Sequence, residues 1–122
     1  MIKNIFIVGA GGFLGSVIRL LCYQFIKSQD SFIITTLINC VGSFAIGLII
    51  GLHMKNQSIS HQWKLFLATG LCGGFTTFST FSWENLQLIQ TGKYIIALFN
   101  IIASLLFGII AAFLGYKLSE LL

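Results

Sequence analysis

The chain alternates four long apolar runs with three short polar breaks. The runs cover residues 2–26, 32–54, 64–89 and 94–118. A helix that crosses the hydrocarbon core of a bilayer takes about 20 apolar residues, so each run is long enough for one crossing. Because lipid offers no partner for free backbone groups, the pattern predicts an all-α integral membrane protein with four transmembrane helices in one domain.

Aromatic residues stand beside lysines at the ends of these runs. The pairs are Tyr23 with Lys27, Trp63 with Lys64, Tyr94 with Lys93 and Tyr116 with Lys117. Amphipathic rings and basic side chains gather at the level of the lipid headgroups. These pairs therefore mark the two interfaces of the predicted membrane domain.

Composition excludes several other classes of protein. Of the 122 residues, 57% are hydrophobic and 8% are charged, against about 25% charged in an average soluble protein. The basic residues are scattered singly, which argues against a nucleic-acid surface. Cys22, Cys40 and Cys72 all lie within apolar runs and lack the spacing of a metal site, so they are interpreted as buried small residues.

The distribution of positive charge predicts an unusual topology. With four crossings, both termini share one side of the membrane, and the other side holds the remaining loops. The first side collects Lys3, Lys55, Lys64 and Lys117, and the second collects Lys27, Lys93 and Arg19. Orientation in the membrane follows an excess of Lys and Arg on one side, and here there is almost none. We therefore expect insertion in both orientations and assembly as an antiparallel homodimer.

Glycines in the first run resemble a dinucleotide-binding fingerprint. Gly9, Gly12 and Gly15 have a suitable spacing, but the fingerprint also needs a strand, a helix and an acid about 20 residues further on. Asp30 lies in a polar turn instead of after a second strand. A nucleotide site is therefore not expected, and close helix packing explains the glycines.

The third run contains the most polar segment. Residues 70–82 hold three glycines and five hydroxyl side chains within an otherwise apolar run. Gly73 and Gly74 weaken a helix, and irregular backbone at membrane depth survives only where protein or a cavity surrounds it. This segment predicts a broken third helix whose free carbonyls suit cations and whose hydroxyls and amides suit anions. A crossing point with hydroxyls bonded back to their own helix is the alternative.

Phenylalanines recur every third residue in the same segment. Phe75, Phe78 and Phe81 fall near one face of a helix, interleaved with hydroxyl residues. The edge of an aromatic ring carries positive potential, so two edges could hold a small dehydrated anion. The alternative is a stripe of rings that packs a core.

Other polar side chains lie inside the first, second and fourth runs. The amide of Asn39 can donate to an anion or bond to a neighbouring helix, and Asn100 with Ser104 could extend a polar track. Arg19 and Glu84 are ionisable groups within apolar runs, which is costly in lipid. They serve either an anion vestibule or a structural ion pair.

Three segments resemble the bacterial CrcB/Fluc fluoride channels. They are residues 11–19, residues 39–44 and residues 70–82 with the following Glu84. The resemblance covers essentially the whole chain. It implies a passive, fluoride-selective channel of the cell membrane that lowers cytoplasmic fluoride without catalysis, built as a dual-topology antiparallel homodimer with two pores.

The resemblance also assigns roles to individual residues. It implies that Phe78 and Phe81 are pore-lining rings and that Asn39 is the pore asparagine. It further implies a polar track with Ser79, Thr80 and Ser104, and a structural Na⁺ at the dimer centre held by the backbone carbonyls of Gly73 and Thr76 from both subunits. Asn100 stands where some members have an aromatic hydroxyl.

Two other function classes remain to be weighed. A small multidrug-resistance-type transporter is also short, four-helical and dual in topology, but it needs a carboxylate in its first span for proton exchange. The first run here contains Arg19 and no acid. An accessory membrane subunit would explain the glycines but not the phenylalanine and hydroxyl segment.

Overall fold

The computed structural model describes residues 1–26, 28, 30–56 and 59–122, and all its regular elements are helical. The elements are α1 (Ile2–Phe25), α2 (Ser31–Asn56), α3 (His61–Lys64), the π-helical segment η1 (Leu65–Cys72), α4 (Gly73–Phe75), α5 (Phe78–Gln90) and α6 (Tyr94–Leu121). The described residues contain no strand, which confirms the all-α prediction.

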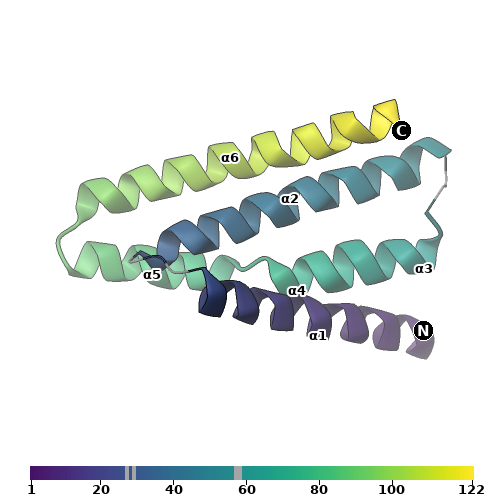
Figure 1. Ribbon diagram of the computed structural model, residues 1–122, viewed down its shortest axis with the longest axis horizontal. Coiled ribbons are helices and arrows are strands. Elements are labelled where there is room, and N and C mark those ends of the chain that lie inside the picture. The colour runs from purple at the N-terminus through teal and green to yellow at the C-terminus, as the bar shows by residue number, and fades with distance from the viewer. Residues whose placement is uncertain (27, 29, 57–58) are drawn as a thin grey trace.

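The helices are arranged as the hydropathy pattern predicts. Among the described residues, three helices are long and apolar enough to cross a membrane: α1, α2 and α6. The fourth predicted crossing is built from the shorter segments between His61 and Gln90. Both termini lie at the same end of the molecule (Figure 1), as an even number of crossings requires. Lys27, which was counted for topology, lies outside the described residues.

Helices α2 and α6 lie side by side and form the largest interface (Figure 1). Small residues make this close approach possible. A Cβ added to Gly47 would collide with the Ala112 carbonyl oxygen, and one added to Gly115 would collide with that of Phe44. Gly47 and Gly115 therefore serve the close packing of these two helices.

Helix α1 packs in the same way against η1 and α4. An added Cβ would meet the backbone of η1 at Gly11 and the backbone of α1 at Gly70 and Gly74. Residues 2–25 form one uninterrupted helix, so Gly9 and Gly12 do not lie in a strand-to-helix turn. This confirms that the glycine spacing is no dinucleotide fingerprint.

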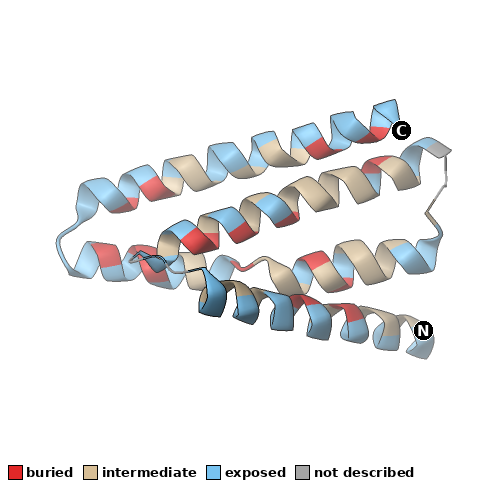
Figure 2. Cartoon of the chain, viewed as in Figure 1, coloured by how far each residue is buried: buried red, intermediate tan, exposed pale blue. Residues whose placement is uncertain are grey.

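Much of the apolar surface remains uncovered. Buried residues gather where helices face one another, and the outer faces are largely exposed (Figure 2). In each of α1, α2 and α6, only 11% to 22% of the most apolar 18-residue stretch is buried inside the protein. Large side chains such as Phe6 and Phe99 are among the exposed ones. Such a surface suits lipid or a second protein chain, and it would be costly in water.

The third crossing is broken, but not at the glycines that weaken it. Gly73 and Gly74 are both helical and form α4 with Phe75. The backbone leaves the helix at Thr76 (φ −74°, ψ 156°) and Thr77 (φ −150°, ψ 118°), and α5 begins at Phe78. The glycine pair therefore permits close packing of α1, and the interruption follows it.

We predict that the stability of the protein depends on the close packing of α2 against α6. Gly47→Val should lower the free energy of unfolding by about 1–3 kcal/mol, because the added side chain collides with the backbone of α6. Thermal unfolding in detergent measures the change. Gly9→Ala is the matched control, since nothing lies within 4 Å of its added Cβ. Equal melting temperatures for Gly47→Val and the native chain would contradict this interpretation.

Candidate functional site

The break between α4 and α5 leaves backbone groups that need new partners. In a continuous helix, the N–H of Thr77 would bond to the carbonyl of Gly73, and that of Thr80 to the carbonyl of Thr76. Here Thr77 is the N-cap of α5, and its Oγ1 accepts the hydrogen bond from the Thr80 N–H (3.2 Å). A hydroxyl at this position is a preferred helix cap.

Asn39 of α2 closes the other side of the break. The Thr77 N–H donates to Asn39 Oδ1 (2.8 Å), and Asn39 Nδ2 donates to the Thr77 carbonyl (3.1 Å). The sequence leaves two roles open for this amide, a bond to a neighbouring helix and donation to an anion. The structure combines them, because the pair of bonds uses one Nδ2 hydrogen and leaves the second without a protein acceptor among the described residues.

A cavity of about 270 Å³ lies beside the break and brings four of the predicted pore residues together. Asn39, Phe78, Phe81 and Ser104 line it, along with Ser43, Ile46, Thr76, Thr77, Leu105 and Gly108. No lysine, arginine or acid is among these residues. A small anion here would meet amide, hydroxyl and ring-edge groups, none of which carries a full charge.

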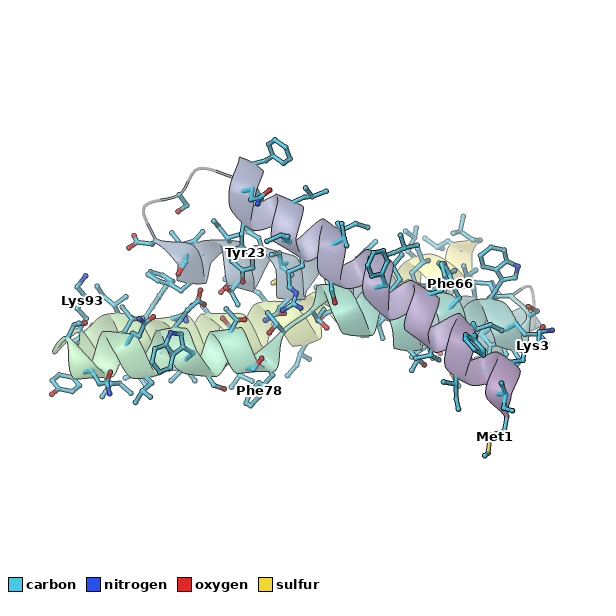
Figure 3. The ribbon with its side chains drawn as sticks, turned by 90° about the horizontal axis from the view of Figure 1, so that it is seen from below. Met1, Lys3, Tyr23, Phe66, Phe78 and Lys93 are labelled. Atoms are coloured by element: carbon cyan, nitrogen blue, oxygen red, sulfur yellow. The ribbon has the colours of Figure 1, made fainter. Side chains whose placement is uncertain are left out.

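The two rings of the cavity lie close together on α5. The centroids of Phe78 and Phe81 are 5.7 Å apart, with 36° between the ring planes. Phe78 is 77% exposed and lies at the outer edge of the molecule (Figure 3). Phe75 does not share their helix, because the break separates it from Phe78. The prediction that three rings form one helical face is therefore wrong for Phe75.

Ser79 and Thr80 lie in the first turn of α5 and do not line the cavity. Thr77 Oγ1 is 3.2 Å from Ser79 Oγ and donates to Thr80 Oγ1 (3.1 Å). These contacts cluster the hydroxyls around the cap of α5. A place for both residues on an ion path stays a prediction.

A network of polar side chains joins α2, α5 and α6 beside the cavity. Thr36 Oγ1 lies 2.9 Å from Ser104 Oγ and 3.2 Å from Asn100 Oδ1. Asn100 Nδ2 donates to Asn85 Oδ1 (3.1 Å), and Asn85 Nδ2 donates to the Phe81 carbonyl (2.8 Å). The network begins at Ser104 and ends at Phe81, both of which line the cavity, so it fixes their relative positions.

A second polar chain joins α1, α2 and α5. Tyr23, labelled in Figure 3, lies where α1 passes over these helices. The Tyr23 hydroxyl lies 2.6 Å from Thr35 Oγ1, which donates to Glu84 Oε1 (2.9 Å). Glu84 is 6% exposed, and its Oε2 has no hydrogen-bond partner among the described residues. Thr35 is therefore the hydrogen-bond donor to this carboxyl group among the described residues, and it reaches Oε1 alone.

Arg19 and Glu84 do not form the ion pair that was considered for them. Within the described part of the chain, the one salt bridge joins Lys117 to Glu120 (2.8 Å) near the C-terminus. Arg19 is half-buried one helical turn before Tyr23. It lies on the same side of α1 as Tyr23, so it remains a candidate vestibule residue.

The residues expected to hold a cation offer suitable oxygen atoms. The carbonyls of Gly73 and Thr76 receive no backbone hydrogen bond among the described residues, because the break has redirected both helical donors. Gly73 is exposed, and an added Cβ there would meet only the Ala68 carbonyl oxygen, 4.0 Å away. Two carbonyls without a backbone donor, one of them on an exposed residue, fit a hard cation such as Na⁺, which prefers oxygen ligands.

Sequence reasoning missed several residues that support this site. Thr35, Thr36 and Asn85 are buried or half-buried, and each makes an interhelical hydrogen bond. Their only signal is a polar side chain inside an apolar run, which does not indicate a partner. Another cavity, of about 490 Å³ between α2 and α6, is lined mostly by apolar side chains and is a poor site for a small anion.

Comparison with known proteins shows similarity along nearly the whole chain. The family model described as "CrcB-like protein, Camphor Resistance (CrcB)" matches residues 6–116. A relative from Azobacteroides pseudotrichonymphae is 43% identical, with 98% of each chain covered. One from Oceanobacillus iheyensis is 41% identical over 96% of this chain and 92% of the relative, and one from Pyrococcus furiosus is 40% identical over 98% of each. All three are named "Fluoride-specific ion channel FluC".

We predict that Thr35 is needed to bury Glu84. Thr35→Val should lower the free energy of unfolding by about 1–3 kcal/mol, because Glu84 Oε1 loses its donor inside the bundle. Ser82→Ala removes an exposed hydroxyl that bonds only to its own helix and should change stability little. Thermal unfolding of both variants in one detergent makes the comparison. An equal loss of stability in the two variants would contradict a particular role for the hydrogen bond from Thr35 to Glu84.

Proposed function

The chain belongs to the CrcB-like family, and on this premise we propose that it is a fluoride-selective channel that lowers cytoplasmic fluoride by passive efflux. It is a multi-pass membrane protein. The observation that carries the proposal is the uncharged cavity at the helix break, where Asn39, Ser104, Phe78 and Phe81 meet. No catalytic step is needed, since the ion moves down its electrochemical gradient.

Weak ligands suit the transport of a strongly hydrated ion. Fluoride must lose water to enter a narrow path, so the path has to supply replacement donors. In this proposal the second Nδ2 hydrogen of Asn39, the hydroxyls of Ser43 and Ser104 and the ring edges of Phe78 and Phe81 supply them. A fixed positive charge in the cavity would hold the ion more tightly and slow its release.

The remaining predicted residues belong to the approaches of this path. Ser79 and Thr80 would extend it along the start of α5, beside the cap at Thr77. Arg19 would draw anions toward a vestibule, since it has no salt-bridge partner among the described residues. Glu84, held by Thr35, would act in assembly of the bundle.

An antiparallel homodimer would complete the cavity. Phe78 is 77% exposed, and lipid against this ring would leave the path open on one side. A second copy in the opposite orientation would cover the ring and part of the exposed apolar surface. The nearly even distribution of basic residues supports insertion in both orientations.

The same dimer would complete a structural Na⁺ site. One copy offers the carbonyl oxygens of Gly73 and Thr76, and two copies related by a twofold axis would offer four. Bound there, the ion would neutralise the partial negative charge of carbonyls that face each other across the interface. The residues hold the ion through backbone oxygen, so their side chains are not the ligands.

The proposal of a channel is favoured over the multidrug-resistance-type transporter. The first span contains no carboxylate, and the matched family and relatives point to a channel. Efflux of ions from liposomes separates the two functions, because a proton-coupled drug transporter would not release fluoride.

We predict rapid fluoride release from liposomes that contain the purified protein, with chloride retained. Phe78→Ile should reduce the fluoride rate by at least about tenfold, because the substituted side chain has no positive ring edge. Phe6→Ile is the matched control, since Phe6 is similarly exposed but lies near the N-terminus, away from the break. Equal release of fluoride and chloride, or none of either, would contradict the channel.

Dual topology is tested separately from transport. C-terminal fusions to one reporter active in the cytoplasm and to another active outside it should both give signal, because the charge bias is nearly zero. Adding two lysines at the C-terminus should shift the population toward one orientation. A signal from a single reporter in the unmodified chain would contradict dual insertion.

A further inference from the structure

The Gly73 and Thr76 carbonyls at the helix break are free for one structural reason. A helix that continued past Phe75 would pair the Gly73 carbonyl with the Thr77 N–H and the Thr76 carbonyl with the Thr80 N–H. Neither bond forms. Both donors bond to side chains instead, so the side chains that accept them decide whether the carbonyls remain free.

The first donor is redirected by α2. The Thr77 N–H donates to Asn39 Oδ1 at 2.8 Å, and Asn39 Nδ2 returns a bond to the Thr77 carbonyl at 3.1 Å. The two bonds fix which end of the Asn39 amide is oxygen, since only oxygen can accept from the N–H. The second donor, the Thr80 N–H, bonds to Thr77 Oγ1 at 3.2 Å within the cap of α5.

Asn39 also sets the direction of the Thr76 carbonyl. The N–H of Thr77 and the C=O of Thr76 belong to one planar trans peptide, in which they point in opposite directions. The N–H points at Asn39, which lines the cavity. The Thr76 carbonyl is therefore directed away from Asn39. The N–H of this peptide thus points at a residue of the cavity, and its carbonyl, which has no hydrogen-bond donor among the described residues, points the other way.

We propose that Asn39 is a positioning residue for the cation site, and that it thereby couples this site to the anion cavity. The inference rests on the proposed Na⁺ site at Gly73 and Thr76. Asn39 acts through the backbone: its Oδ1 withdraws a donor from the Gly73 carbonyl and orients the peptide that carries the Thr76 carbonyl. Without that acceptor, the Thr77 N–H returns to the Gly73 carbonyl and removes one ligand.

Thermal unfolding of the full-length protein in detergent tests this without measuring transport. NaCl is titrated against N-methyl-D-glucamine chloride at constant ionic strength, and the Na⁺ concentration at half-maximal stabilisation is recorded. Asn39→Leu, similar in shape but without an acceptor, should raise this concentration at least about tenfold. Asn39→Asp keeps an acceptor for the Thr77 N–H and should remain within about threefold of the native value.

Two control variants and a second variant at the break make the test specific. Ser104→Ala alters the same cavity without removing an acceptor at the break, and Ser82→Ala removes an exposed hydroxyl that bonds only to its own helix, so both should leave the Na⁺ response unchanged. Thr77→Val frees the Thr80 N–H to bond to the Thr76 carbonyl and should weaken the response as Asn39→Leu does. Thr77→Val also decides the matter if Asn39→Leu does not fold.

The outcomes separate this inference from the channel itself. A weakened Na⁺ response in Asn39→Leu or Thr77→Val, with Asn39→Asp and Ser104→Ala unaffected, supports it. An unchanged response in the acceptor-less variants overturns it, and so does a native protein that shows no Na⁺ response. Fluoride release from native proteoliposomes persists in either of the latter cases if the proposed function is correct.

Discussion

The structure depends on how the backbone is satisfied at one interruption within the membrane. A free N–H in hydrocarbon is costly, so a break in a spanning helix needs partners from elsewhere in the protein. Asn39 supplies them from α2 by exchanging two hydrogen bonds with Thr77, and the hydroxyl of Thr77 caps the next helix. Without these contacts, a continuous third helix would be the better arrangement for the same residues.

Close helix packing makes this exchange possible. Gly74 of α4 and Gly15 of α1 allow backbones to approach beside the break, and Gly42 gives Thr76 space against α2. Gly47 and Gly115 bring α6 against α2, which places Ser104 at the cavity. The glycines therefore contribute to function indirectly, because close helix packing brings polar groups from three helices together.

Hydropathy was enough to predict the number of crossings, their approximate ends and the polar character of the third crossing. It did not locate the break, because glycine content reports the intrinsic weakness of a helix and not the tertiary partner that interrupts it. That partner, Asn39, is separated from Thr77 by 38 positions. The donor to Glu84 was missed for a similar reason, since Thr35 lies 49 positions away and a lone threonine in an apolar run gives no hint of its contact.

The most direct test of the account asks where fluoride binds. Solid-state NMR of the protein in bilayers, with ¹⁵N in asparagine side chains and ring-labelled phenylalanine, can detect transfer of magnetisation from bound ¹⁹F⁻. The account predicts contacts from fluoride to the Asn39 amide and to the rings of Phe78 and Phe81, which line one cavity. Bound fluoride that contacts none of these three residues would contradict it.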